Sequence, residues 1–234
     1  MKIKNIAIIC CRSGSKGIKF KNQKNFLGKP ILFWLNQELK KSKLFHEIYL
    51  SSDSKKVCSI GKNLGMVSDL RPKKYATSHA CVFDVHNYIL NKFKINDKNF
   101  RICIVNNSPF LKSDHFIKTF KVFKQHKSKR VTMLVKKTDK ENIYFRQARK
   151  IRNFLKPIFK KELIQSKINR QTMQQTFVNI GDLRWGRKKP LCNYKNFNIE
   201  ICNNGYAHVE VNESDYLDMN TERDWKVALK KFKN

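Results

Sequence analysis

The segment that decides the fold lies near the start of the chain, where residues 5–32 read NIAIICCRSGSKGIKFKNQKNFLGKPIL. Residues 5–10 (NIAIIC) are almost all apolar, which is typical of a buried strand. Residues 11–28 are polar and contain three Gly and many Lys, so a loop is expected there. Pro30 opens a helix that is expected to reach about Lys41, because Pro suits the first turn of a helix. A buried strand, a Gly-containing loop and a helix thus follow one another closely.

The same alternation continues along the chain. Further strands are expected at residues 47–52 (EIYLSS), 101–105 (RICIV) and 131–135 (VTMLV), and further helices at about 54–64, 80–94 and 113–125. Asp53 or Ser54 is expected to cap the first of these helices. Ser113 or Asp114 is expected to cap the last one, and Gly65 stands where a helix commonly ends.

Strands and helices at this spacing indicate parallel βαβ units with helices on both faces of one sheet. The predicted fold class is therefore α/β with a mainly parallel sheet. In such sheets ligands bind beyond the carboxyl ends of the strands. The loops that begin at residues 11, 53 and 106 should therefore converge on one site.

Residues 138–176 differ from the rest, because they are rich in Lys, Arg, Asn and Gln and have no regular apolar pattern. We interpret them as an excursion, after which strands return at 176–180 and 207–211 and a last helix spans 221–232. Thr221 and Asp224 resemble a capping box at the start of that helix. The predicted organisation is one domain formed by residues 1–137 and 177–234, with residues 138–176 inserted.

The size and cysteine content exclude several classes of protein. A chain of 234 residues with 41% hydrophobic residues can bury the core of one α/β domain. No stretch approaches 18 apolar residues and no signal peptide fits the first residues, so neither a membrane span nor secretion is expected. Seven Cys, an odd number without metal-type spacing, favour a reducing cytoplasm.

The net charge of +32 is the unusual feature of the composition. A charge of this size suggests nucleic acid or an anionic membrane surface as a partner. However, the excess is spread along the chain, and Lys greatly outnumbers Arg, whereas base readout favours Arg. We therefore favour a solvated basic surface and do not expect nucleic acid as a partner, with a basic nucleic-acid-binding protein as the alternative.

The first loop, residues 11–18 (CRSGSKGI), carries the strongest local signal of function. A loop of small residues that leaves a buried strand exposes backbone N–H groups to an anion. Arg12, Lys16 and Lys21 add fixed positive charge, so the loop suits a triphosphate. Its spacing is not that of a Walker loop. The alternative is a loop without a ligand.

Several motifs, taken in order, resemble the CMP-sialic acid synthetases, which are acylneuraminate cytidylyltransferases. The first loop with Lys21-Asn22 is similar to the opening of that family. The other matching segments are Ser51-Ser52-Asp53, Arg71-Pro72, Tyr75-Ala76-Thr77, Asp84-Val85, Asn107-Ser108-Pro109-Phe110, and Leu217-Asp218-Met219-Asn220-Thr221-Glu222 with Asp224. The resemblance covers nearly the whole chain.

The resemblance implies a Rossmann-like nucleotidyltransferase fold of the nucleotide-diphospho-sugar transferase type. It implies transfer of CMP from CTP to an acidic 2-keto sugar with nine carbons, such as a sialic, legionaminic or pseudaminic acid, with release of pyrophosphate. It also implies Mg²⁺ as cofactor and a homodimer joined through the 138–176 arm. The nearest rival sugar is an eight-carbon ulosonic acid.

The resemblance also assigns roles to residues of this chain. Arg12 and Lys21 would hold the CTP phosphates and act as the catalytic cations. Nucleotide binding would involve these two residues together with Ser13, Gly14, Ser15, Lys16, Gly17, Asn22, Arg71, Ala76 and Thr77. Asn107, Ser108 and Arg184 would bind the sugar, and Asp218 and Asn220 would bind the metal. Trp185 would pack on a sugar face, unless residues 179–186 form a strand-edge turn with an exposed Arg and a core Trp.

This sequence departs from the family pattern at positions that concern the metal and the sugar. Asn220 replaces the second metal carboxylate, and Val105 replaces a Gln of the sugar pocket. Leu111 replaces an Arg, although Lys112 follows, and milder changes place Ser at positions 13 and 78. These changes leave two alternatives open: a pseudoenzyme that binds CTP without turnover, and a nucleic-acid-binding protein on a transferase fold.

Overall fold

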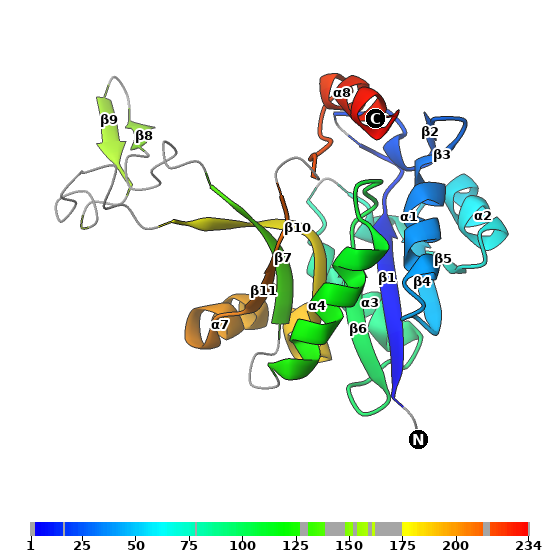
Figure 1. Cartoon of the computed structure of the whole chain (residues 1–234), viewed down its shortest axis with the longest axis horizontal. Helices are drawn as coiled ribbons and strands as arrows, with labels where there is room; N and C mark the ends of the chain where they lie inside the picture. The colour runs from blue at the N-terminus through cyan, green and yellow to red at the C-terminus, as the bar shows by residue number, and fades with distance from the viewer. Residues whose placement is uncertain are drawn as a thin grey trace.

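The computed structural model describes residues 3–15, 17–77, 79–126, 131–138, 148–151, 154–158, 161, 175–212 and 216–233. Within them a central seven-stranded sheet has the order β11-β7-β10-β6-β1-β4-β5 (Figure 1). Its strands are β1 (Lys4–Cys11), β4 (Glu47–Ser52), β5 (Val67–Leu70), β6 (Phe100–Val105), β7 (Val131–Lys137), β10 (Phe177–Gly186) and β11 (Ala207–Glu210). The helices are α1 (Ile31–Lys41), α2 (Lys55–Asn63), α3 (Val82–Lys92), α4 (Ser113–Gln125), α6 (Lys188–Cys192), α7 (Tyr194–Asn204) and α8 (Glu222–Lys233).

The sheet is mainly parallel, as the sequence predicts. β1 is paired in parallel with β4 on one side and β6 on the other, β5 is parallel to β4, and β11 is parallel to β7. β10 is the exception, because it runs antiparallel to both β6 and β7. The carboxyl ends of β1, β4, β6 and β7 therefore lie along one edge, and β10 enters the sheet from that edge.

Both faces of the sheet are covered because β1 is apolar on both sides. Ala7, Ile9 and Cys11 belong to a core cluster with residues of α1, α2 and α4. Ile6 and Ile8, which alternate with them, belong to a second cluster with residues of α3 and α6. The alternation of side chains along a strand thus places two helical layers on opposite faces.

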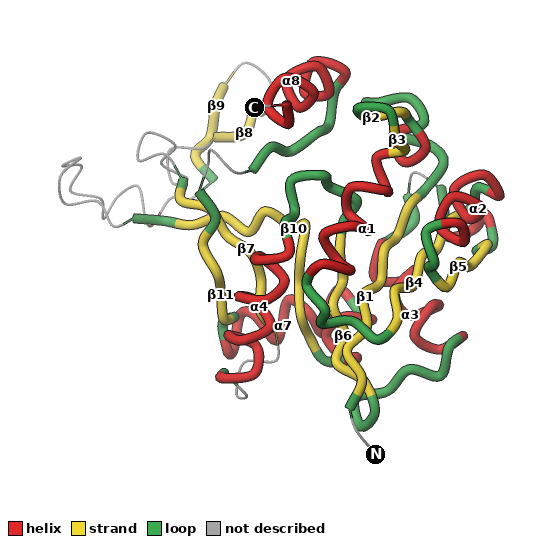
Figure 2. Tube along the Cα trace, turned by 45° about the vertical axis from the view of Figure 1, so that its right-hand side comes forward, coloured by secondary structure: helices red, strands yellow, loops and turns green. Residues whose placement is uncertain are grey.

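A third apolar cluster holds α8 over the carboxyl edge of the sheet. Ile18 and Phe26, from the loop after β1, are fully buried with Met219 and Trp225. The Phe26 and Trp225 rings meet edge to face with centroids 5.3 Å apart. In Figure 1, β1 runs upward from the N-terminus and α8 lies at the end toward which it points; Figure 2 shows the same arrangement after rotation. This cluster joins the first loop to the segment before α8.

Most of the predicted helix ends are confirmed. The Ser54 side chain caps α2 by accepting from the Val57 N–H at 3.3 Å. Gly65 has a φ of +82°, and the Gly65 and Met66 N–H groups return to the last turn of α2. This is the Schellman arrangement, in which glycine adopts the left-handed conformation without strain. The Thr221–Asp224 capping box is also present, with Asp224 N donating to Thr221 Oγ1 at 3.2 Å.

The expected cap of α4 is wrong. Lys112 stands at the capping position and α4 begins at Ser113. The Ser113 N–H instead donates to the Glu38 carboxylate of α1 at 2.7 Å, so a long-range contact satisfies this helix end. Strand β5 and helices α6 and α7 were not foreseen either. α6 and β5 are short, and α7 carries Asn and Lys between its apolar residues, so their patterns are weak.

Part of the predicted excursion is described between β7 and β10. Strands β8 (Ala148–Ile151) and β9 (Phe154–Pro157) pair antiparallel in a separate sheet, which lies away from the central sheet in Figure 1. Thr138 N donates to Thr176 O at 3.0 Å at the base of this segment. Most other residues of 138–176 lie outside the described ranges. No helix among the described residues is long and apolar enough to cross a membrane.

His86 gives the fold a predictable response to acid. It is buried on α3, where its Nδ1 lies 3.1 Å from the Leu191 carbonyl oxygen. Burial, together with the charge of Arg184, lowers its pKa to about 3, although the hydrogen bond to Leu191 acts in the opposite direction. As the pH falls, the unfolded chain takes up this proton at a higher pH than the folded chain does. The contribution of neutral His86 to the free energy of unfolding is therefore intact above about pH 6.5 and is lost as the pH falls toward 3.

We therefore expect His86→Asn to flatten the pH dependence of the free energy of unfolding between about pH 6 and 4. The slope should decrease by up to about 1.4 kcal/mol per pH unit, which is the value for one proton. Urea unfolding monitored by circular dichroism at several pH values measures it. His126→Asn, at the exposed end of α4, is the matched control and should keep the slope. An unchanged slope in His86→Asn would contradict a neutral buried imidazole.

Candidate active site

A polar cavity of about 230 Å³ lies at the carboxyl ends of β1 and β6. It is formed by three segments that are distant in the sequence: the loop after β1, the loop after β6, and the residues before α8. β10 adds a residue where it enters the sheet. The lining residues are Cys10, Arg12, Ser15, Lys21, Asn22, Asn106, Asn107, Ser108, Asp182, Leu217, Asp218, Met219 and Asn220.

Hydrogen bonds join the first loop to the loop after β6. Asn22 Nδ2 donates to the Arg12 carbonyl at 2.9 Å, which closes the first loop on itself. Asn107 Nδ2 donates to Asn22 Oδ1 at 3.0 Å. Asn22 thus links the strand ends of β1 and β6, as expected from the convergence of parallel strands at one edge.

Asp53 fixes the back of the first loop. Its carboxylate accepts from Ser13 N at 2.8 Å and from Ser13 Oγ at 2.5 Å. Burial raises the pKa of Asp53, but the Ser13 hydrogen bonds and the Arg71 charge outweigh burial and lower it overall. The carboxylate therefore stays ionised as an acceptor for the loop. The signal for this role was present in the sequence, but capping of α2 explained Asp53 equally well.

Arg71 supports this arrangement from beneath the site. Its side chain is buried, with Nη1 donating to Ser51 O at 2.6 Å and Nη2 lying 3.8 Å from Asp53 Oδ1. It does not line the cavity. Arg71 would therefore affect a bound ligand only indirectly, through Asp53 and the Ser13 that Asp53 holds.

The first loop also contacts the segment before α8. Lys21 Nζ donates to the Met219 carbonyl at 2.8 Å. The backbone of Gly17 lies so close to Asn220 that a Cβ added to Gly17 would be 1.7 Å from the Asn220 carbonyl oxygen. Glycine is therefore required at position 17 by space. Arg12 and Lys21 thus line the same cavity as Asp218.

The acidic side of the cavity carries two carboxylates and one amide. Asn220 Nδ2 donates to Asp218 Oδ2 at 2.7 Å. Asp182 lies on β10, and its pKa is raised to about 6 by burial first and by the Asp218 charge second. Hydrogen bonds from Asn106 and Tyr216 and the Lys21 charge act in the opposite direction. The set of oxygen donors suits a hard divalent cation.

One further group in the cavity is an acceptor without a partner. Asn107 is 7% exposed, and its Oδ1 is buried without a hydrogen bond. Buried polar atoms are normally paired, so an unpaired oxygen beside a cavity is typical of a ligand site. Cys10 adds no nucleophile here, because burial raises its pKa to about 12 and its thiol stays neutral.

β10 brings Asp182 to the cavity through an irregularity in the sheet. Pairing with β7 shifts register between Asn179 and Arg184. Gly181 has a φ of +76° there, a conformation that favours glycine. The Asp182 carbonyl accepts from Asn106 N at 2.8 Å, at the point where β6 ends. The bulge therefore places residue 182 beside the end of β6.

The structure brings together most of the residues expected at the site. Arg12, Ser15, Lys21, Asn22, Asn107, Ser108, Asp218 and Asn220 line one cavity. Those that lie outside this lining are Ser13, Gly14, Gly17, Arg71, Ala76, Thr77 and Arg184. Lys16 and Ser78 lie outside the described residues. The cavity residues that the sequence analysis missed are Cys10, Asn106, Asp182, Leu217 and Met219.

Arg184 and Trp185 pack against the protein interior, so they fit the alternative with a core Trp better than the sugar-binding one. The Arg184 guanidinium lies over the Phe83 and Phe197 rings, 5.8 and 5.4 Å from their centroids. Arg184 is half-buried, so the exposed Arg of that alternative is not found. Trp185 is fully buried, and its Nε1 donates to Thr119 Oγ1 at 3.1 Å. Packing of Trp185 on a sugar face is therefore wrong, because the core covers the indole.

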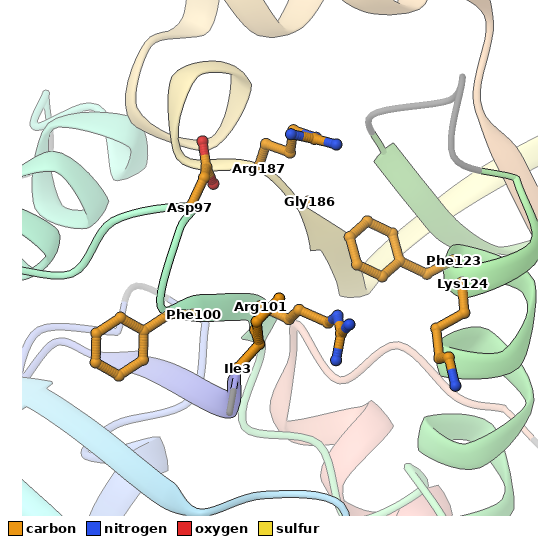
Figure 3. Close-up of a pocket in the computed structure, with 8 residues that line it drawn as sticks. All are labelled: Ile3, Asp97, Phe100, Arg101, Phe123, Lys124, Gly186 and Arg187. Carbon is orange, nitrogen blue, oxygen red and sulfur yellow. The ribbon is translucent and has the colours of Figure 1, made fainter. Parts of the chain in front are cut away.

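A second cavity of about 220 Å³ lies at the opposite edge of the sheet, where β1 and β6 begin. Figure 3 shows Arg101, Lys124 and Arg187 around it with Phe100 and Phe123. None of the residues expected from the sequence lines this cavity. The edge at the amino ends of parallel strands is also not where ligands of such sheets bind. We therefore assign the candidate active site to the first cavity.

Comparison with known proteins places this site in a family context. The family described as cytidylyltransferase matches residues 6–191. A pseudaminic acid cytidylyltransferase and UDP-2,4-diacetamido-2,4,6-trideoxy-beta-L-altropyranose hydrolase of Helicobacter pylori is 32% identical over 53% of this chain and 24% of its own length. An N-acylneuraminate cytidylyltransferase of Escherichia coli is 32% identical over 53% of this chain and 29% of its own. A pseudaminic acid cytidylyltransferase of Campylobacter jejuni is 31% identical over 54% of this chain and 56% of its own length.

The alignments thus span between about a quarter and just over half of each relative. Solved structures extend the likeness of the fold over the whole chain. A CMP:2-keto-3-deoxy-manno-octonic acid synthetase complexed with CTP matches with a TM-score of 0.74 and 12% identity, covering 98% of each chain. A 4-diphosphocytidyl-2C-methyl-D-erythritol synthase of Anaerococcus prevotii matches with a TM-score of 0.60 and 13% identity, covering 99% of each chain.

The close approach of Gly17 to Asn220 can be tested by stability. We expect Gly17→Ala to lower the free energy of unfolding by about 1–3 kcal/mol, because the added methyl meets backbone atoms that must move apart. Gly14→Ala is the matched control in the same loop, since nothing lies within 4 Å of its added Cβ. Urea unfolding of both variants measures the difference. Equal stabilities of the two would contradict the tight contact.

Proposed function

The chain belongs to the cytidylyltransferase family, and from this we propose that it transfers CMP from CTP to an acidic 2-keto sugar with release of pyrophosphate. One observation carries the proposal. One cavity combines two cations from the first loop, amides and a hydroxyl from the loop after β6, and the carboxylates of Asp182 and Asp218. This distribution of charge suits a triphosphate together with a second, polar substrate.

Phosphate binding is assigned to the first loop. Arg12 and Lys21 contribute positive charge at the cavity, and Ser15 lines it beside them. Asp53 holds Ser13 from behind through both its N–H and its hydroxyl, so the backbone of the loop is fixed before the ligand arrives. Preorganised charge of this kind stabilises a phosphoryl-transfer transition state. This proposal includes roles in forming the loop for Ser13, Gly14, Lys16 and Gly17. It also includes roles near the cytosine base for Ala76, Thr77 and Arg71.

The reaction needs alignment more than covalent help. The anomeric hydroxyl oxygen of the sugar forms a bond to the α-phosphorus of CTP, the bond from that phosphorus to the bridging oxygen breaks, and pyrophosphate leaves with release of a proton. Asn22 would orient the nucleotide, while Asn107 and Ser108 would orient the sugar. The relatives that act on N-acylneuraminate and pseudaminic acid support a nine-carbon sugar, and Arg184 could face its carboxylate only after leaving its two aromatic neighbours.

Mg²⁺ is the proposed cofactor, and the residues present fit it. The Asp218 carboxylate and the Asn220 amide oxygen would hold it, since Asn220 Nδ2 already donates to Asp218 and leaves its oxygen to accept. Among the described residues no group of three His, Cys, Asp or Glu forms a ready-made metal site. When bound, Mg²⁺ would neutralise phosphate charge at the reacting centre.

A homodimer in the cytoplasm completes the proposal. Exposed apolar residues lie on β10 where the chain re-enters the central sheet, at Phe177 and Val178, and within the arm at Ile158, after β9. Such residues on the proposed arm (138–176) and its base favour contact with a second copy. All seven cysteines are free, which favours a reducing compartment.

The activity is tested by pyrophosphate release from CTP and Mg²⁺ with a panel of sialic, legionaminic, pseudaminic and eight-carbon ulosonic acids. We expect release with a nine-carbon sugar and a decrease in kcat/KM of about 10²–10³-fold in Arg12→Ala, because a cation at the transferred phosphate is lost. Arg187→Ala is the matched control, since Arg187 is exposed at the second cavity.

The other outcomes select among the alternatives. CTP binding without release from any sugar would indicate a pseudoenzyme, which the Asn at position 220 would then explain. The absence of both CTP binding and pyrophosphate release would overturn the proposal. In that case the basic surface would become the leading clue, and RNA affinity that falls steeply with salt would be the next measurement.

The dimer is tested by sedimentation velocity. We expect the unaltered protein to sediment as a dimer and Val178→Asp to shift it toward monomer, because a charge would be buried in the contact. Val227→Asp is the control, since Val227 is similarly exposed and lies on α8, outside residues 138–176 and the flanking strands. A monomeric unaltered protein, or a dimer that Val178→Asp leaves intact, would refute this contact.

A further inference from the structure

We propose that Asp182 is a metal-ligating residue that supplies, from β10, the carboxylate that position 220 lacks. The proposal rests on the proposed function, because it concerns the divalent cation of the same site. It places the cation between β10 and the segment before α8, with Asp182 on one side and Asp218 on the other. Neither the family motif nor the sequence of residues 217–224 contains this ligand.

The first argument is position. Asp182, Asp218 and Asn220 line the same cavity. The family motif places two carboxylates two residues apart in one segment. In this chain the two carboxylates, Asp182 and Asp218, come from separate segments that line the same cavity.

The second argument is that the Asp182 backbone is fixed. Its carbonyl accepts from Asn106 N at 2.8 Å, and its Oδ1 lies 3.3 Å from Asn106 Nδ2. The residue is 8% exposed and follows Gly181, whose positive φ directs the chain at the bulge. A side chain held by a β-strand is a more rigid donor than one on a free loop.

The third argument is the unpaired Asn107 oxygen. Asn107 lines this cavity, is 7% exposed, and presents a buried Oδ1 that has no hydrogen-bond donor. Its Nδ2 is occupied by Asn22, so the amide is oriented with its oxygen as the free end. This acceptor lacks a positive or donating partner, which a cation bound in this cavity would supply.

The test measures binding of Mn²⁺ alone, by electron paramagnetic resonance of the free ion, to protein without CTP or sugar. We expect Asp182→Asn and Asp218→Asn each to weaken Mn²⁺ binding at least tenfold. Asp114→Asn, which alters an exposed aspartate on α4, is the control and should leave Mn²⁺ binding within twofold. The decisive variant is Asp182→Asn combined with Asn220→Asp, which should regain most of the affinity by returning the carboxylate to position 220.

A second measurement uses the unaltered protein, so it does not depend on how the variants fold. Fe²⁺ with ascorbate cleaves a backbone near the residues that bind the ion. We expect fragments that end near residue 182 as well as near residues 218–220, mapped by mass spectrometry. Cleavage confined to 218–220, or Mn²⁺ affinity that Asp182→Asn leaves within twofold, would overturn the proposal.

These results are separable from those on activity. Pyrophosphate release with unchanged Mn²⁺ affinity in Asp182→Asn would reject the ligand and keep the proposed function. Mn²⁺ binding through Asp182 without release from any sugar would keep the ligand and reject the function. Absence of Mn²⁺ binding to the unaltered protein would reject the ligand whatever the activity.

Discussion

The site depends above all on the contact between the first loop and the segment before α8. These segments are about 200 residues apart, and they meet where the Gly17 backbone lies against the Asn220 carbonyl and Lys21 reaches Met219. The apolar cluster of Ile18, Phe26 and Trp225 stabilises this contact from behind. Without it the cations of the loop and the carboxylates opposite would not share one cavity.

This contact also gives the cavity its polarity. A phosphate loop by itself offers positive charge and N–H groups, and carboxylates by themselves repel phosphate. In this cavity both kinds of group line the same space. The surrounding amides, from Asn22, Asn106 and Asn107, carry no charge and connect the two walls by hydrogen bonds.

Much of the fold could be predicted from the sequence, because its strands are buried on both faces and appear as short apolar runs. β1, β4, β6 and β7 were each expected within two residues of their observed ends. The elements that were missed are short or carry polar residues, and the cap of α4 was wrong because Glu38, a distant residue, satisfies that helix end. Local pattern cannot show a partner supplied by another helix.

The sequence by itself determined the mainly parallel α/β fold, the loop rich in positive charge after the first strand, and Asp218 before the last helix. These are local features: apolar runs, small residues and capping patterns act within a few residues. Only the tertiary structure decided that Asp182 enters the cavity, that Arg71 acts from beneath it, and that Trp185 belongs to the core. The physical reason is the pairing of β10, whose antiparallel direction and bulge at Gly181 set which side chain faces the site. Strand direction and register arise from contacts between distant segments, so no short stretch of sequence contains them.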